Sequence, residues 1–273
     1  MSVASSAQRT ARRAGDSTTL ELVTRAGFVG YGLFHLAVAW LALQIALAHP
    51  AGESDQSGAF QVLLRQPLGR ILLWLIVGGL AAMALWQLLE AAVGHRAERG
   101  TSRIMERLAS VGRVLVYSAL AWTAYRTVSG VGTSSAAQQR AATTGALAHP
   151  AGRWLVAAAG VAIVALGVGM VVYGAKRKFE KRLKLSQLTG ATRRVVVRSG
   201  QLGYLTKGFA YTIVGVLGVT AALKHDAAKS TGLDGALREL VAKPFGELLL
   251  AIVAAGFAAH GLYCFFQARY RKV

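Results

Sequence analysis

Three short stretches decide the fold of this chain: Pro67-Leu68-Gly69-Arg70, Pro150-Ala151-Gly152-Arg153 and Pro244-Phe245-Gly246-Glu247. An apolar run long enough to cross a membrane stands before and after each of them. The same two-helix unit therefore occurs three times, and such repeats fix an architecture before other features are considered. We divide the chain into a cytoplasmic tail, residues 1–20, and one domain, residues 21–273, with repeats at 25–95, 107–180 and 198–270.

The composition indicates an integral membrane protein. Of 273 residues, 54% are hydrophobic and only 16% are charged, and the mean hydropathy is +0.43. A soluble domain carries about 25% charged residues. Three stretches almost lack charge and can each cross a hydrocarbon core of about 30 Å: Gly27 to Leu47, Ile71 to Leu89 and Leu155 to Ala175. Because these runs are continuously apolar rather than alternating, they predict helices and not the strands of a barrel.

We expect an all-α fold with six membrane-spanning helices. Each unit contributes an even number of spans, so the three copies point the same way and are related by an axis along the membrane normal. A pseudo-threefold ring of three hairpins is the simplest packing. The odd helices are predicted at Gly27–Leu47, Leu108–Val128 and Leu202–Leu223, and the even helices at Arg70–Ala92, Arg153–Ala175 and Gly246–Gln267.

The segment before each marker proline is predicted to lie at the outer interface. Apolar residues at helical spacing before Pro67 and Pro244 indicate short amphipathic helices. The corresponding segment before Pro150 is four residues shorter, so a helix one turn shorter, or a loop, is expected there. The proline itself suits the first turn of the even helix, where its missing N–H costs nothing. The glycine-rich spans favour a tight bundle over a wide pore, with Gly160, Gly167, Gly208, Gly215 and Gly256 as examples.

Basic residues predict the orientation. Lys and Arg number four in the tail, five in the second loop, nine in the fourth and three at the C-terminus, against nine in the other three loops together. This distribution places both termini in the cytoplasm. The cluster from Lys176 to Lys184 is expected against anionic lipid headgroups. The net charge of +19 thus reflects topology, and we expect no nucleic-acid partner.

Five short motifs lie within the first and third repeats: Arg25-Ala-Gly-Phe-Val-Gly30, Arg198-Ser-Gly-Gln-Leu-Gly203-Tyr204, Gly232-Leu-Asp-Gly-Ala-Leu237, Pro244-Phe-Gly and Gly261-Leu-Tyr-Cys-Phe. In these motifs the chain resembles the bacterial membrane family called domain of unknown function 1206. The resemblance implies three tandem two-helix units in a bacterial cytoplasmic membrane, and it implies no activity. Unit two departs most from the pattern, since Arg113 stands where Tyr31 and Tyr204 stand in the other units.

Polar residues within the spans are the candidate functional residues, because such groups are costly in a membrane. We expect them to act as interhelical contacts, with Lys207 reaching the headgroups or pairing with Glu90. The alternatives are a ligand or proton path from the cytoplasm, and a haem held between two histidines. The ionisable residues within the spans are His35, Glu90, Arg113, Arg126, Lys207 and His260, and the neutral Gln87 joins them.

The sequence favours no enzyme, cofactor or metal. It lacks an HExxH motif, a phosphate-binding glycine loop and a Gly-x-Ser-x-Gly motif. His260 and Cys264 are one helical turn apart, but two ligands do not make a metal site. The predicted function is a non-enzymatic structural or partner-binding module, such as an accessory subunit of other membrane proteins. A small-solute or proton-coupled transporter is the main alternative, and a haem protein using His35 and His260 is the lesser one.

Overall fold

The architecture is helical throughout the part of the chain that the computed structural model describes, residues 18–47, 56–93, 100–132, 134–149, 151–230 and 232–271. Apart from one isolated β-bridge between Leu183 and Arg271, every regular element in these ranges is a helix. Most of the predicted tail, residues 1–20, lies outside the described residues, and so does Pro150. The long helices are α2 (Thr18–Ala46), α4 (Gly69–Val93), α5 (Gly100–Val128), α7 (Gly152–Ala175), α8 (Gly190–Lys224) and α10 (Gly246–Tyr270).

Five of the six predicted spans are confirmed as helices long and apolar enough to cross a membrane: α2, α4, α7, α8 and α10. The sixth, α5, is a single helix of 29 residues, but Arg113 and Arg126 interrupt its apolar stretch. The predicted starts of the odd helices were late, because the helices continue into the polar segments before the spans. For example, α8 begins at Gly190 and not at Leu202.

The six long helices pack mainly as three pairs formed between units. The pairs are α4 with α5, α7 with α8, and α10 with α2, so each even helix lies against the odd helix of another unit. Within units one and three, α2 also packs on α4 and α8 on α10. The two helices of unit two, α5 and α7, make little or no contact in the described residues. The expected closed ring is therefore open at unit two.

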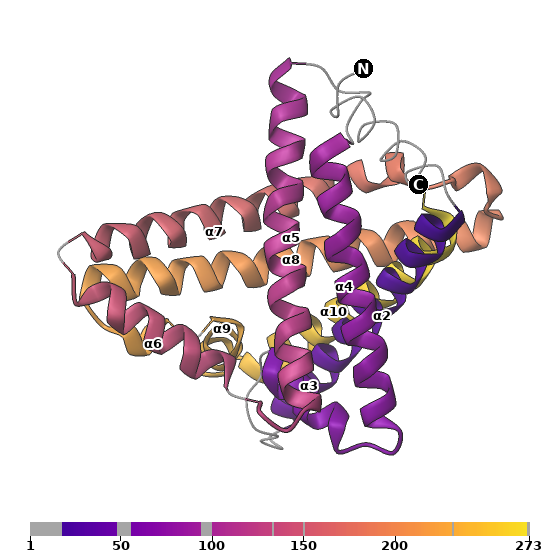
Figure 1. The fold of residues 1–273 in the computed structure, drawn as a ribbon. Helices are drawn as coiled ribbons and strands as arrows, with labels where there is room; N and C mark the ends of the chain where they lie inside the picture. The colour runs from indigo at the N-terminus through magenta and orange to yellow at the C-terminus, as the bar shows by residue number, and fades with distance from the viewer. Residues whose placement is uncertain are drawn as a thin grey trace.

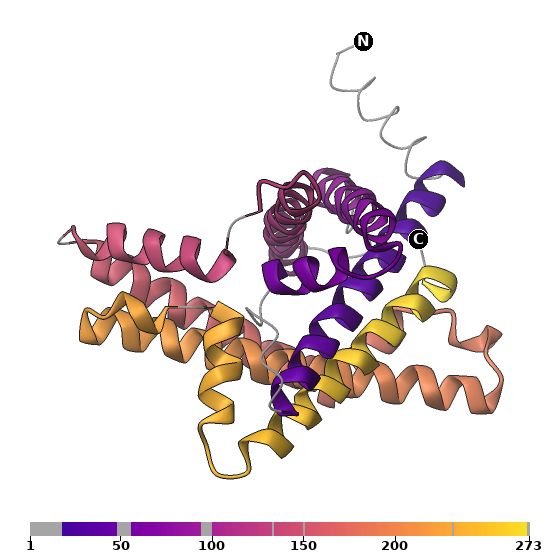
Figure 2. The same cartoon turned by 90° about the horizontal axis from the view of Figure 1, so that it is seen from below.

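The pairs are steeply inclined to one another. In Figure 1, α4 and α5 run along the vertical, whereas α7 and α8 run across the view. Figure 2 shows α4 and α5 nearly end-on while α7 and α8 still lie across. The pair of α2 and α10 crosses between the other two, and both of its helices contact a neighbouring pair. This middle pair is therefore the most enclosed part of the molecule.

The short helices α3 (Gln56–Leu64), α6 (Ser135–Leu147) and α9 (Gly232–Val241) gather at one end, as parallel repeats require (Figure 1). The Ser135 backbone N–H donates to Ser57 Oγ at 3.0 Å, which joins α6 to α3. The Thr143 hydroxyl donates to Ser230 Oγ at 2.8 Å, which joins α6 to the segment before α9. Polar contacts between units thus hold this end together.

The prediction for unit two was wrong, because within the described residues α6 is the longest of the three short helices. It has 13 residues, against 9 in α3 and 10 in α9. The helix gains its length at the N-terminal side, where the Ser134 side chain accepts a hydrogen bond from the Ala137 N–H at 2.8 Å. Such a cap lets α6 begin upstream of the short segment that precedes Pro150. The helix therefore gains at its N-terminal end the length that the four missing residues do not supply.

The marker glycine, and not the marker proline, begins each even helix. Gly69, Gly152 and Gly246 are the first helical residues, and Pro67 and Pro244 lie in the preceding turns. The expected place of the proline in the first helical turn was therefore wrong. A Cβ on any of the three glycines would overlap a backbone carbonyl at the end of the preceding short helix, at Leu63, Ala146 or Val241. The repeated motif encodes one tight turn that only glycine fits.

Glycines also line the contact between α7 and α8, as expected for close helix approach. A Cβ on Gly167 would lie 2.6 Å from the Thr212 backbone nitrogen and 2.7 Å from the Gly208 carbonyl oxygen. Gly160 and Gly215 face each other in the same way further along the pair. The prediction of tight helix contacts is confirmed for this pair.

Candidate functional site

The candidate polar residues separate into two clusters and some peripheral positions. His35, Lys207 and His260 come together where α2, α8 and α10 meet, and their exposed fractions are only 2%, 5% and 2%. Gln87 and Arg113 form a second cluster between α4 and α5. Glu90 and Arg126 are half-buried and lie in neither cluster. The expected pair of Lys207 with Glu90 does not form.

Lys207 is the only cation of the central cluster in the described residues. Its ammonium donates to Tyr31 Oη at 2.7 Å and lies 3.4 Å from His260 Nε2. It also lies 4.9 Å from the centroid of the Tyr31 ring, within range of a cation–π contact. No carboxylate pairs with this ammonium among the described residues. Lys207 thus does not extend to the headgroups, as a snorkelling lysine would, and is held by neutral groups alone.

The two histidines and a cysteine present their ligand atoms to one another. His35 and His260 have ring centroids 4.6 Å apart. The His35 Nδ1 lies 2.8 Å from the Tyr31 carbonyl oxygen, which can only accept, so Nδ1 carries the hydrogen and Nε2 carries the lone pair. Cys264 is fully buried, and one ring nitrogen from each histidine and the cysteine Sγ all lie within 4.8 Å of one another. The fold therefore adds a third ligand to the two that the sequence suggested.

The spacing of the histidines bears on the haem hypothesis. Axial ligation needs a porphyrin between the two imidazoles. With centroids 4.6 Å apart, the rings are nearly in contact and leave no space for a macrocycle. Tyr31 and Phe257 also pack around His35, with centroid distances of 4.3 and 6.2 Å. The geometry suits a single small ion and not a large planar group.

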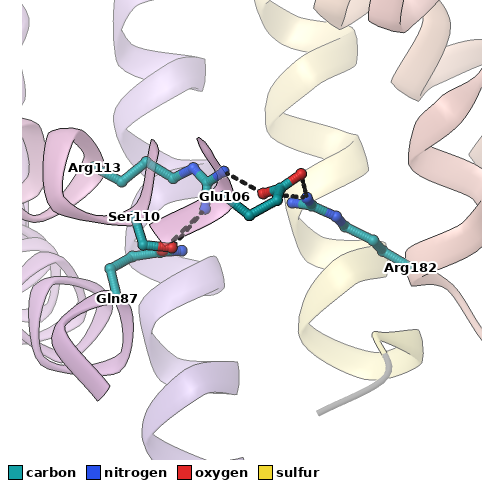
Figure 3. A network of polar contacts seen from close by, with 5 residues as sticks. All are labelled: Gln87, Glu106, Ser110, Arg113 and Arg182. Atoms are coloured by element: carbon teal, nitrogen blue, oxygen red, sulfur yellow. Dashed lines mark hydrogen bonds and ion pairs between the residues drawn. The ribbon is translucent and has the colours of Figure 1, made fainter. Parts of the chain in front are cut away.

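The second cluster is a chain of polar contacts that ties α4 and α5 to the loop after α7 (Figure 3). Arg113 donates to Gln87 Oε1 at 3.0 Å and lies 3.5 Å from the Glu106 carboxylate. Glu106 also pairs with Arg182 at 3.4 Å. Arg182 belongs to the 3₁₀ turn Lys178–Arg182, which is part of the basic loop. Arg113, Glu106 and Arg182 are partly exposed and Gln87 is buried, and their contacts connect the loop after α7 to the α4–α5 pair.

The sequence reasoning missed three residues of these clusters. Glu106 was not considered and Arg182 was placed only in the basic cluster from Lys176 to Lys184, because nothing in the sequence linked two residues 76 positions apart. Tyr31 was noted only as a family position, although Tyr31, Arg113 and Tyr204 stand at equivalent places in the three units. That equivalence was the available signal, because Tyr31 accepts a hydrogen bond from Lys207 in the first cluster and Arg113 donates one to Gln87 in the second.

These features define a multi-pass helical membrane protein built from three repeats, with a buried polar cluster in its middle pair. The sequence profile described as Domain of Unknown Function (DUF1206) matches residues 26–94, 108–177 and 202–271. The chain belongs to this family, and the resemblance seen in its motifs is confirmed. It is also 30% identical over 253 residues to the "Uncharacterized protein YxxB" of Bacillus subtilis (strain 168), covering 91% of this chain and 90% of that protein. No solved structure matches it significantly.

Proposed function

We propose that the protein is a non-enzymatic module of the bacterial cytoplasmic membrane that binds a transmembrane helix of a partner protein. In this proposal α5 is the sixth span, both termini are cytoplasmic, and the short helices lie at the outer interface. The inter-unit helix pairs are arranged about a pseudo-threefold axis, with the ring open at unit two. The basic loop from Lys176 to Lys184 rests on anionic headgroups.

The observation that carries the proposal is an uncovered glycine on α5. Gly30, Gly112 and Gly203 stand at equivalent positions of the three units. A Cβ on Gly30 would meet α4 and one on Gly203 would meet α10, so in both units the glycine serves the crossing with the even helix of the same unit. Around Gly112 no atom of the described residues lies within 4 Å of such a Cβ. Unit two thus keeps the crossing glycine without a helix to cover it.

The surroundings of Gly112 suit a partner helix. Leu108, Val111 and Leu115 flank it and are strongly exposed, with Leu115 68% exposed. A glycine between large apolar residues lets another helix approach closely in a membrane. The expected occupant is a membrane helix with small residues at the crossing point.

Photocrosslinking in native membranes tests this proposal. A photoreactive residue in place of Leu115 should capture one membrane protein, and Gly112→Leu should abolish both the crosslink and its co-purification in mild detergent. Gly78→Leu is the matched control, because Gly78 is also a helical glycine with nothing within 4 Å. Capture that survives Gly112→Leu would overturn the proposal. A disulfide between Gly112→Cys and Ala162→Cys would also overturn it, because it would show that α7 lies against α5. Capture of a second copy of this chain would replace the partner with a homodimer.

Transport has less support from the geometry. A transporter needs a route by which its solute reaches the polar site. His35, Lys207 and His260 are at most 5% exposed, and Glu90, the fourth residue of the transporter hypothesis, lies apart from them. An uptake assay in vesicles distinguishes the two functions, since Lys207→Ala abolishes flux only if Lys207 belongs to a transport site.

A further inference from the structure

We propose that His35, His260 and Cys264 form a binding site for one monovalent copper ion, Cu(I), in the middle of the α2–α10 pair. The three residues are buried, come from two facing helices, and place their ligand atoms within 4.8 Å of one another. The site is independent of the partner surface at Gly112.

The ligand set selects a soft ion. Thiolate and imidazole ligands suit Cu(I) and Zn(II), whereas Mg²⁺ and Ca²⁺ need oxygen ligands. In the described residues no carboxylate belongs to this group. Metal bonds of about 2.0 Å to nitrogen and 2.3 Å to sulfur bridge ligand atoms up to about 4.3 Å apart. A small rotamer change therefore closes the site around an ion.

The hydrogen bond of His35 fits ligation. His35 donates Nδ1–H to the Tyr31 carbonyl oxygen at 2.8 Å, which leaves Nε2 for the metal. A backbone carbonyl holding the second ring nitrogen is the usual support of a metal-bound histidine.

Charge decides between Cu(I) and Zn(II). Lys207 already places one positive charge in this buried region, 3.4 Å from His260 Nε2, and no carboxylate balances it in the described residues. When Cu(I) binds, the Cys264 thiol releases its proton to solvent and a sulfur–copper bond replaces the sulfur–hydrogen bond. One positive charge enters and one leaves, so the net charge is unchanged. Zn(II) would add a charge that this environment disfavours. The ion takes His260 Nε2, and Lys207 keeps Tyr31 as its partner.

Metal binding by the purified full-length protein tests the proposal. Under anaerobic conditions with ascorbate, Cu(I) is titrated against a colorimetric Cu(I) chelator and the bound metal is counted by mass spectrometry. We expect one Cu(I) per chain, and binding at least about a hundredfold weaker in Cys264→Ser and His260→Leu, since even supporting residues contribute 10–100-fold. His149→Ala, which removes an exposed histidine at the end of α6, is the control and should bind as the parent does. Lys207→Met should bind Cu(I) more tightly, because the ammonium competes for His260.

Two further measurements keep the proposal open to refutation. X-ray absorption of the copper-loaded parent protein should show one sulfur and two nitrogen ligands, which requires no variant to fold. Zn(II) added under the same conditions should not displace Cu(I). No stoichiometric Cu(I), binding that is unchanged in Cys264→Ser, a spectrum without sulfur, or preferential binding of Zn(II) would each overturn it.

Discussion

The ammonium of Lys207 donates a hydrogen bond to the phenolic oxygen of Tyr31 at 2.7 Å, across 176 residues of chain. The bond links α8 to α2 in the most enclosed part of the bundle. Its acceptor is neutral, and no carboxylate pairs with the ammonium in the described residues. A buried charge held in this way depends strongly on each remaining partner.

Removing the acceptor should therefore be worse than removing the charge. We expect Tyr31→Phe to lower the free energy of unfolding by about 1–3 kcal/mol, because it leaves the ammonium short of a hydrogen bond. Lys207→Met removes the buried charge itself and should be close to neutral or stabilising. Unfolding titrations with SDS in mixed micelles measure both. The double variant should be more stable than Tyr31→Phe alone, and a Lys207→Met protein less stable than Tyr31→Phe would contradict this account.

The three marker glycines should share one sensitivity. Gly69→Ala, Gly152→Ala and Gly246→Ala each introduce a Cβ that overlaps a backbone carbonyl, and we expect each to cost about 2 kcal/mol or more, as overpacking does. Gly78→Ala serves as the control, because its Cβ would point into open space and helix propensity favours alanine by about 0.5–1 kcal/mol. Thermal unfolding in detergent compares the four proteins. A marker variant as stable as Gly78→Ala would show that the turn can relax.

The contact between α7 and α8 should depend on its small residues. Gly167→Leu forces the two backbones apart where a Cβ would lie 2.6 Å from the Thr212 nitrogen, and a loss of about 1–3 kcal/mol is expected. Gly169→Leu adds the same side chain to α7 at a position with nothing within 4 Å. Protease resistance of the α7–α8 segment in detergent reports the difference. Equal resistance of the two variants would argue against a close glycine contact between α7 and α8.

Glu106 should contribute more than a single surface ion pair. It contacts both Arg113 and Arg182 at 3.4–3.5 Å, with its own side chain 35% exposed. We expect Glu106→Gln to cost about 1 kcal/mol, which is the upper end for such pairs. Glu21→Gln, which breaks the exposed pair with Arg25, should cost less than about 0.5 kcal/mol. Unfolding at low and high salt measures both, and the Glu106 effect should shrink as salt rises.

Local sequence patterns predicted the repeats and five of the six spans, since both depend on apolar runs and on turn residues close in the chain. The length of α6 was missed because a serine cap upstream, and not the distance to Pro150, decides where that helix begins. The near absence of packing between α5 and α7 in the described residues depends on how distant segments pack, which no local pattern encodes. The division of the candidate residues into two clusters also depends on packing between distant segments. His35 meets His260 only because α2 lies against α10.

The proposed orientation in the membrane rests on the basic loops and can be tested by labelling. Arg140 on α6 and Lys178 after α7 are both exposed, and the 24-residue helix α7 lies between them. This helix is about 36 Å long at 1.5 Å per residue, which is long enough to cross a bilayer core of about 30 Å. In intact cells a membrane-impermeant maleimide should label Arg140→Cys and spare Lys178→Cys, because the positive-inside rule places the loop after α7 in the cytoplasm. The native Cys264 is fully buried and should not react. Permeabilised cells provide the control, since both variants should then be labelled, and the reverse pattern in intact cells would invert the proposed topology.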